Sequence, residues 1–466
     1  MDNTTTGARA EATTTQGSVT HEGHSSAAPH ATPIGRRSFL GLAPAGVAAL
    51  GLASSLGDAL ASGLERVSTT ATSYSVGVGN MPDAYAATQR AIGASGEWPT
   101  TLAGRTVVVK PNLVSAKPST SGVTTDPQVV RAVVDQALAS GATSVLIVEG
   151  GSPTSPAPFT PCGYSFFATY DPRVQLVDLG TQPVTLAHVP NGVVYGQLYV
   201  PSLVLDPNVV FISVAKLKCH VDAGATLTMK NLFGLASPVH YPVPSQLPRQ
   251  NLHLRGVDEA IIDLNLVRPV DFAVIDGIWG MQGNGPLSGT PVQMNIVVAG
   301  RNPVAVDRVG LQVMGLPQTT APHLTYAALK GLGPADLTTI AVLGDIFTPG
   351  AFLPAQTPPV VWCPRVTPPA FAPASGQTTT ITYSMPAACY TRVEIIHDSD
   401  VTPGITLVRT LRNWASRPAG TETLVWDGRD DSGAVVAQGS YLAHVQATFA
   451  PASVINYASR WLLITR

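Results

Sequence analysis

The sequence has 466 residues and a formal net charge of −2, a length that corresponds to two or three ordinary domains. Charged residues make up 12% of the chain and hydrophobic residues 45%. These values exclude a wholly disordered protein and also the concentrated basic surface of a nucleic-acid-binding protein, so no nucleic-acid partner is expected. Only six residues are lysine, against 21 arginines, so the position of each lysine is informative.

The N-terminal region is predicted to be a disordered tail followed by an export signal. Residues 1–34 contain almost no large apolar side chains and cannot offset the entropy cost of ordering. Over 35–61, Arg36-Arg37, an apolar stretch and a small-residue cleavage site follow in the order of a signal peptide. The paired arginines resemble the twin-arginine signal, with an ordinary secretory signal or an uncleaved anchor as alternatives. We therefore expect an exported protein, periplasmic, cell-surface or extracellular, with no transmembrane span in the mature chain.

Residues 73–345 alternate between strand-like and helical segments. Asp126-Pro127 and Asn302-Pro303 each pair an N-cap residue with a proline suited to the first helical position. The expected strands are short, continuous apolar runs: 106–109, 144–148, 209–215, 272–275, 295–299 and 339–343. This alternation predicts an α/β domain whose mainly parallel sheet has helices on both faces.

The remainder of the chain is predicted to be a linker and a second, all-β domain. Residues 346–375 are proline-rich without a helical period, which indicates a stiff linker. Residues 376–466 contain alternating strand-like runs, with turn signals such as Asp427-Gly428 and Ser432-Gly433 between them. That pattern predicts a small Ig-like β-sandwich.

Polar residues follow several of the expected parallel strands at the point where each strand ends. Because the carboxyl ends of parallel strands form the ligand-binding edge of an open sheet, these residues are expected to converge. They are Lys110 and Asn112 after the first strand, Glu149 after the second, Lys216, Lys218 and His220 after the third, and Asp276 after the fourth.

A further segment is expected to join this edge. Its apolar positions fit a short helix over 225–234, which would present Lys230 and Asn231 beside the 216–220 loop. Four of the six lysines would then surround one cleft. A lysine there can bind an anion, act as a base or form a Schiff base, whereas the alternative is a rim of ordinary surface lysines.

Glycines and cysteines give weaker signals. The glycine-rich stretch 277–286, with Gly283 and Gly285, resembles a backbone anion-binding loop but is equally consistent with a structural loop. Cys219 has cationic neighbours that would favour its thiolate, although a buried or disulfide-bonded cysteine is the commoner case. Export would permit disulfides among the four cysteines, Cys162, Cys219, Cys363 and Cys389.

Metal and cofactor binding are left open. His220, His240 and His253 are candidate metal ligands whose spacing fits no standard motif. The chain has no Cys-x-x-Cys pair, so it offers no ligand set for an iron–sulfur cluster. Glu149, Asp276 and Asp307 are candidate acid–base groups or cation ligands, and Asp307 is also consistent with a structural role.

Ordered motifs give the α/β region a specific resemblance. These motifs include Val109–Leu113, Thr124–Pro127, Lys216–His220, Thr228–Gly234, Asp276-Gly277, Gly283–Pro286 and Asn302–Asp307. Over about 73–345 the chain resembles the bacterial and archaeal family called domain of unknown function 362. Some relatives join this domain to a ferredoxin-type module, which would imply redox work, but the cysteines for that are missing here.

The C-terminal region has a resemblance of its own. Val408–Leu411, Thr423–Gly433 and Val436–Tyr441 resemble the Ig-like domain of flagellar hook-capping proteins. The resemblance implies attachment or docking to a cell-envelope or protein partner.

Three hypotheses about function follow. The first is an exported protein that binds a small anionic molecule and, as an enzyme, would transform it. Lys216, His220, Lys230, Glu149 and Asp276 would then be catalytic, while Lys110, Asn112, Lys218, Asn231, Gly283 and Gly285 would bind the ligand. The second is a non-catalytic surface or ligand-binding protein docked by its Ig-like domain, and the third is a redox-associated protein.

Overall fold

The computed structural model describes residues 73–150, 156–236, 240–241, 252, 256–355, 362–385, 387–398, 405–449 and 456–465. The predicted tail and export signal therefore lie outside the described residues, as do His253 and the side chain of Cys363. Within the described ranges, no helix combines the length and apolar character needed to cross a membrane.

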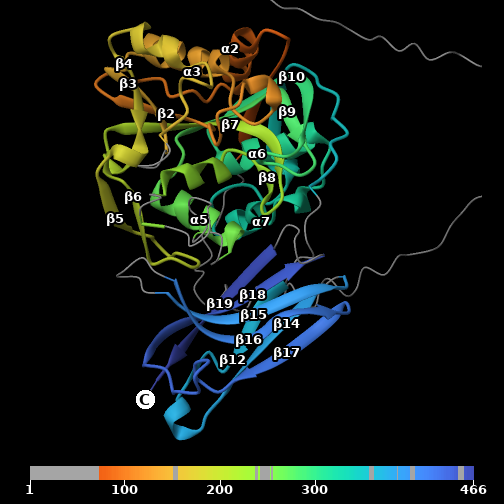
Figure 1. Cartoon of the computed structure of the whole chain (residues 1–466). Helices are drawn as coiled ribbons and strands as arrows, with labels where there is room; N and C mark the ends of the chain where they lie inside the picture. Colours follow the sequence, from red (N-terminus) through yellow and green to blue (C-terminus); the bar gives the residue numbers. More distant parts are fainter. Residues whose placement is uncertain are drawn as a thin grey trace, which may run out of the picture. The chain divides into compact units, whose positions relative to one another are not determined.

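A nine-stranded sheet forms the centre of the α/β region (Figure 1). Its order is β11-β1-β10-β9-β7-β2-β3-β4, with β8 hydrogen-bonded to β7. The β11–β1, β9–β7, β7–β2, β2–β3 and β3–β4 pairs are parallel, whereas β10 is antiparallel to both of its neighbours. The strands are β1 (Tyr74–Asn80), β2 (Thr106–Pro111), β3 (Ser144–Glu149), β4 (Val174–Asp178), β7 (Val209–His220), β8 (Gly224–Thr226), β9 (Phe272–Gln282), β10 (Thr290–Gly300) and β11 (Ile340–Gly344).

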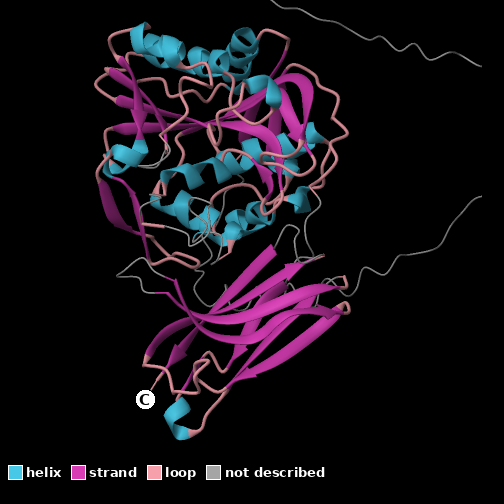
Figure 2. Cartoon of the chain, in the orientation of Figure 1, coloured by secondary structure: helices cyan, strands magenta, loops and turns pink. Residues whose placement is uncertain are grey.

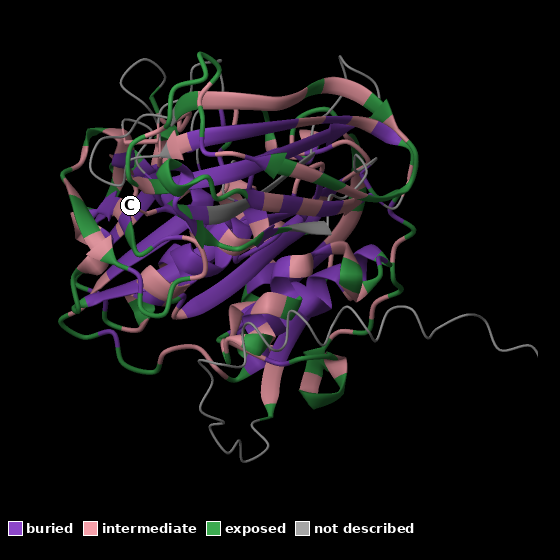
Figure 3. Ribbon diagram, turned by 90° about the horizontal axis from the view of Figure 1, so that it is seen from below, coloured by how far each residue is buried: buried purple, intermediate pink, exposed green. Residues whose placement is uncertain are grey.

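Helices cover both faces of this sheet (Figure 2). On one face lie α2 (Ala84–Ser95) and α3 (Pro127–Ala139), and on the other lie α5 (Val257–Val267), α6 (Pro303–Met314) and α7 (Pro322–Leu329). Val107 and Val109 of β2 pack in the hydrophobic core on the side of α2 and α3, and Val108 packs in the core on the side of α5, α6 and α7. Successive side chains of a strand point to opposite faces of the sheet. The central strands β2, β7 and β9 are almost wholly buried, which explains their continuous apolar sequences, and Figure 3 colours the buried residues of the chain purple. The predicted α/β fold is confirmed.

The helix starts follow the predicted cap chemistry. The Asp126 carboxylate accepts a hydrogen bond from the Gln128 amide and begins α3, and the Asn302 side chain accepts one from the Ala305 amide and begins α6. In both helices a proline occupies the first turn, where its missing N–H has no cost.

Three local predictions need correction. β7 continues to His220 and β9 to Gln282, so the Lys216–His220 segment is a strand and not a loop. The segment before Gly234 is a 3-10 helix, η5 (Lys230–Leu235), and not the expected α-helix over 225–234. The first residues of the expected helix, Ala225 and Thr226, belong instead to β8, which pairs with Cys219 and Lys218 of β7.

The C-terminal region consists of two β-sheets that share a core. One sheet has the order β12-β14-β17 and the other β13-β19-β18-β15-β16. Trp426 and Ile381 from the first sheet pack in one cluster with Ile395 and Tyr441 from the second, as in a sandwich. The strands are β12 (Trp362–Thr367), β13 (Ala370–Phe371), β14 (Thr379–Met385), β15 (Cys389–Asp398), β16 (Ile405–Arg417), β17 (Gly420–Trp426), β18 (Gly439–Thr448) and β19 (Asn456–Ile464).

The β region begins before the predicted boundary at residue 376. β12 and β13 lie within the segment interpreted as a linker, and they pair with β14 and β19. Two of the eight prolines in 346–375, Pro368 and Pro369, form the connection between these two strands. A separate hairpin, β5 (Val184–His188) with β6 (Gln197–Pro201), completes the described strands of the α/β region.

Candidate functional site

The sheet order places the ends of β2, β3, β7 and β9 side by side. β7 pairs in parallel with β2 on one side and with β9 on the other, and β2 pairs in parallel with β3. In this register Lys216 lies opposite Asp276, and Lys110 lies opposite Ser213. The polar strand ends therefore share one edge of the sheet, and we call the lysines there, with their partners, the strand-end cluster.

Lys110 forms a buried ion pair with Glu149. Its Nζ lies 2.8 Å from Glu149 Oε1, and it also donates to the Pro111 carbonyl and to Asn231 Oδ1. Burial opposes ionisation of Glu149, but the Lys110 charge and hydrogen bonds from the Leu113 and Gly150 amides outweigh it and lower the pKa of this carboxyl. The Lys110 charge is thus balanced within the protein.

Gly234 makes this ion pair possible. A Cβ at this position would lie 2.6 Å from Lys110 Nζ and 2.8 Å from Glu149 Oε1. Only a residue without a side chain allows η5 to approach the pair this closely. Spacing and composition gave no sign of this role.

Lys216 forms a second buried ion pair, with Asp276. The Lys216 Nζ to Asp276 Oδ2 distance is 2.8 Å, and neither side chain is exposed. Asp276 also accepts hydrogen bonds from the backbone amides of Asp126 and Ile278. Burial nevertheless raises the pKa of the Asp276 carboxyl, because it outweighs the attraction of Lys216.

Lys218 lies in the same strand without such a counter-charge. Its side chain is fully buried, and its Nζ donates to the Val123 carbonyl at 2.7 Å. Among the described residues, no carboxylate forms an ion pair with it. Burial, together with the positive charges of Lys216 and Lys230, holds the pKa of Lys218 well below its usual value.

Lys230 and His220 complete the strand-end cluster. Lys230 Nζ lies 3.8 Å from the centre of the Phe233 ring, a cation–π geometry. His220 Nδ1 accepts hydrogen bonds from the Asp222 and Ala223 amides, so this nitrogen acts as an acceptor and the neutral ring carries its proton on Nε2. Burial raises the pKa of Asp222 to about 6, against the opposing influence of Lys230.

The segment from Val123 to Asp126 connects the strand ends, a role that the sequence analysis missed. Thr125 donates its amide to the Asn112 carbonyl and its hydroxyl to the Val214 carbonyl, and its own carbonyl accepts the Tyr164 hydroxyl. The Asp126 amide binds Asp276, and the Val123 carbonyl binds Lys218. The sequence signals here were the helix start at Asp126-Pro127 and the family-like motif Thr124–Pro127, and neither indicates contacts between strand ends.

The remaining predicted ligand-binding residues occupy different positions. Asn231 donates to the Lys110 carbonyl and to Ser213 Oγ, so it connects β2 and β7 beneath the cluster. Asn112 Oδ1 is buried and has no hydrogen-bond partner within the described part of the chain. Gly283 and Gly285 lie in the β9–β10 connection, where a Cβ on Gly285 would meet the Cys219 carbonyl at 1.9 Å. Close packing against β7 accounts for Gly285.

Cys219 is a buried cysteine, the commoner of the cases left open by the sequence. Burial raises the pKa of Cys219 to about 11, so its thiolate is disfavoured. Its chain neighbours Lys218 and His220 point to the opposite face of β7, because strand side chains alternate. Cys162, Cys219 and Cys389 are free thiols. His240 stacks on Tyr199, and the described residues contain no cluster of three or more metal-ligating side chains.

Asp307 has a structural role, the alternative left open by the sequence. Its carboxylate accepts hydrogen bonds from the Thr228 amide and hydroxyl and from the Met229 amide. α6 thereby holds the segment that leads into Lys230. Burial raises the pKa of Asp307 to about 6.

Comparisons with known proteins identify the segment that carries this site. The family model described as a domain of unknown function (DUF362) matches residues 107–312, which span the strand-end cluster. The thylakoid-associated protein sll1697 of Synechocystis sp. is 28% identical over 250 residues, which cover 50% of this chain and 71% of that protein. The segment that holds the cluster is therefore a DUF362 domain.

Two solved structures have only a weak similarity to this chain. The alkylpurine DNA glycosylase AlkC of Pseudomonas fluorescens, bound to DNA with an abasic site analog, is 16% identical over 35% of this chain and 46% of its own, with a TM-score of 0.17. The β-glucosidase EmGH1 of Erythrobacter marinus is 11% identical over 84% of this chain and 49% of its own, also with a TM-score of 0.17. The chain spans about half the length of these two structures.

Proposed function

We propose that the strand-end cluster binds a small anionic molecule through a carboxylate or phosphate group, and that Lys218 is the residue whose charge this ligand balances. The observation that carries the proposal is the difference among the buried lysines. Lys110 and Lys216 each have a carboxylate at 2.8 Å, whereas Lys218 Nζ donates to the Val123 carbonyl and forms no ion pair with any carboxylate in the described part of the chain.

The energetics of burial support this assignment. A buried ammonium without a counter-charge is costly, so burial and the cationic neighbours Lys216 and Lys230 lower the pKa of Lys218 and favour its neutral amine. An anion beside Lys218 would supply the missing negative charge and favour the ammonium form. Ligand binding would then be coupled to the uptake of a proton by Lys218.

Two further groups favour a ligand at this edge. Lys230 supplies positive charge next to Lys218, and the two interact electrostatically. Asn112 Oδ1 lacks a hydrogen donor in the described region, and its backbone binds the same Val123–Asp126 segment as Lys218. A hydroxyl on the ligand, or a protonated phosphate oxygen, would satisfy this acceptor.

Substitution of Lys218 tests the proposal. We expect native mass spectrometry of the purified protein, or a thermal-shift screen of carboxylates and phosphates, to identify an anion that binds. Lys218→Met should weaken its binding at least tenfold, since a charge-assisted contact in a buried site contributes more than a neutral one. Lys117→Met, at an exposed lysine of the same domain, is the matched control and should bind as the unmodified protein does.

Two outcomes would contradict the proposal. One is that no anion in the screen binds the folded protein, and the other is that Lys218→Met binds every anion as tightly as Lys117→Met. Deletion of residues 356–466, which contain the whole described β-sandwich, should leave binding intact because the cluster lies within 107–312. Loss of binding on this deletion would place part of the site in the C-terminal region.

A further inference from the structure

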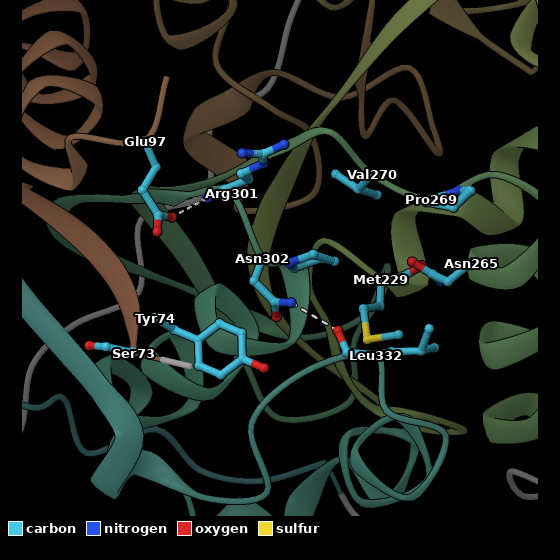
Figure 4. A pocket seen from close by; sticks show the side chains of 11 residues that line it. Ser73, Tyr74, Glu97, Met229, Asn265, Pro269, Val270, Arg301, Asn302 and Leu332 are labelled. Atoms are coloured by element: carbon cyan, nitrogen blue, oxygen red, sulfur yellow. Dashed lines mark hydrogen bonds between the residues drawn. The ribbon is translucent and has the colours of Figure 1, made fainter. Parts of the chain in front are cut away.

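A cavity of about 450 Å³ lies on the side of the sheet covered by α5 and α6, apart from the lysines of the strand-end cluster (Figure 4). Its wall comes from the start of β1, the end of α5, the residues before β9 and the N-terminus of α6. The apolar lining consists of Met229, Pro269, Val270, Pro303 and Leu332. A volume of this size is typical of a site for a small organic molecule.

Asn265 contributes an unused acceptor to this wall. Its side chain is 3% exposed, and its Nδ2 donates to the carbonyls of Met229 and Ile261. These two carbonyls fix the orientation of the amide, because the reversed orientation would place oxygen against oxygen. Asn265 Oδ1 is therefore an acceptor, and it has no partner among the residues that the structure describes.

Other polar groups of the cavity define what can satisfy this acceptor. Both Glu97 oxygens accept backbone amides, from Ser75 and Arg301, so this carboxylate already serves the protein. The Asn302 side chain is likewise engaged, with the Ala305 amide and the Leu332 carbonyl. Tyr74 extends its hydroxyl toward Met229 and Leu332 in Figure 4.

We propose that this cavity binds a small, largely apolar molecule that carries a hydroxyl group, with the hydroxyl donating to Asn265 Oδ1. An apolar body matches the lining formed by Met229, Val270 and Leu332. A neutral hydroxyl fits better than a charged amine, because the rim carries the Arg301 guanidinium and the Glu97 carboxylate is already occupied. The site is independent of the anion site at Lys218.

Two probes that differ only in the hydrogen donor test this proposal on the full chain. 4-Fluorophenol carries the hydroxyl, and 4-fluoroanisole replaces its hydrogen with a methyl group. In fluorine NMR titrations we expect 4-fluorophenol to bind about three- to tenfold more tightly, the effect of one hydrogen bond. Equal affinities, or no binding of either probe, would overturn the proposal.

Substitutions place the binding in this cavity. Leu332→Trp should fill the space and abolish binding of both probes, while the matched Leu329→Trp, at a leucine that is 44% exposed, should not change it. The Leu332 main-chain bond to Asn302 is kept in the variant. Asn265→Ala should remove the preference for 4-fluorophenol. If 4-fluorophenol binds the folded Leu332→Trp protein as before, the site lies elsewhere and the proposal fails.

Discussion

Lys218 differs from the other lysines of the strand-end cluster in what lies next to its Nζ. Lys110 and Lys216 are paired with Glu149 and Asp276, a difference from Lys218 that no local sequence pattern indicates. Scarcity and strand-end placement predicted the group, and the structure shows which members have a counter-charge. The proposed role in anion binding therefore rests on one residue more than on the others.

Removal of this amine should stabilise the protein without ligand. The pKa of Lys218 is lowered in the folded protein, so below its ordinary value the unfolded chain binds a proton that the folded chain does not. Stability contributed by this residue is thus lost as the pH falls toward neutrality. We expect Lys218→Met to have a higher Tm than the unmodified protein at pH 7, by about 2–8 °C for roughly 1–2 kcal/mol. The difference should shrink toward pH 10, and a lower Tm for the variant at pH 7 would refute this reasoning.

Gly234 gives a second test at the residue scale. Gly234→Ala places a methyl group against the Lys110–Glu149 pair, so we expect a loss of about 1–3 kcal/mol in the free energy of unfolding. Gly93→Ala is the matched control, because a Cβ at this helical position of α2 meets nothing within 4 Å. This substitution should raise the free energy of unfolding by about 0.5–1 kcal/mol. Urea unfolding measures both changes, and equal effects would contradict the role of Gly234.

At the scale of elements, α6 positions the segment that leads into η5. Asp307 holds Thr228 and Met229 by three hydrogen bonds, and Lys230 follows directly. Asp307 of α6 therefore fixes the backbone directly before Lys230. A change at Asp307 should therefore alter both stability and the placement of Lys230.

The pH dependence of stability tests the Asp307 carboxylate. Its pKa is raised from 3.8 to about 6 in the folded protein. Between these values the folded chain holds a proton that the unfolded chain has released, so this residue makes stability fall as the pH rises from about 4 to about 6. Asp307→Asn should lose that contribution and should also destabilise the protein by about 1–3 kcal/mol, since an amide cannot accept all three donors. Unfolding curves of both proteins at pH 4, 5, 6 and 7 measure this pH dependence of the free energy of unfolding. The same pH dependence in Asp307→Asn as in the unmodified protein would contradict the role given to the Asp307 carboxylate.

The sequence predicted those elements whose signals are local. The cap residues before proline predicted where α3 and α6 begin, and the apolar runs predicted most strands of the mainly parallel sheet. The extension of β7 to His220 was missed, because lysines at alternate positions read as polar when their partners are unknown. Pairing of Lys216 with Asp276, 60 residues away, depends on sheet order, which no local pattern encodes.

At the scale of the whole molecule, the chain combines a DUF362 domain with a C-terminal β-sandwich. We propose that the chain is exported through the twin-arginine signal expected at 35–61 and that the sandwich docks it to a cell-envelope or protein partner. Arg36→Lys together with Arg37→Lys should abolish export, because this route requires the arginine pair. Fractionation of cells that express both forms measures this, with Arg9→Lys as the control, and unchanged export of the double variant would exclude the route.

The proton balance of anion binding tests the role of Lys218 most directly. With an anion identified in the screen, calorimetric titrations at pH 8 in two buffers of different ionisation enthalpy give the number of protons taken up. We expect net proton uptake by the unmodified protein and by Lys117→Met, and little or none by Lys218→Met, which should also bind the anion more weakly. Binding without proton uptake, or the same uptake in Lys218→Met, would contradict the assignment of Lys218 as the residue that the ligand neutralises.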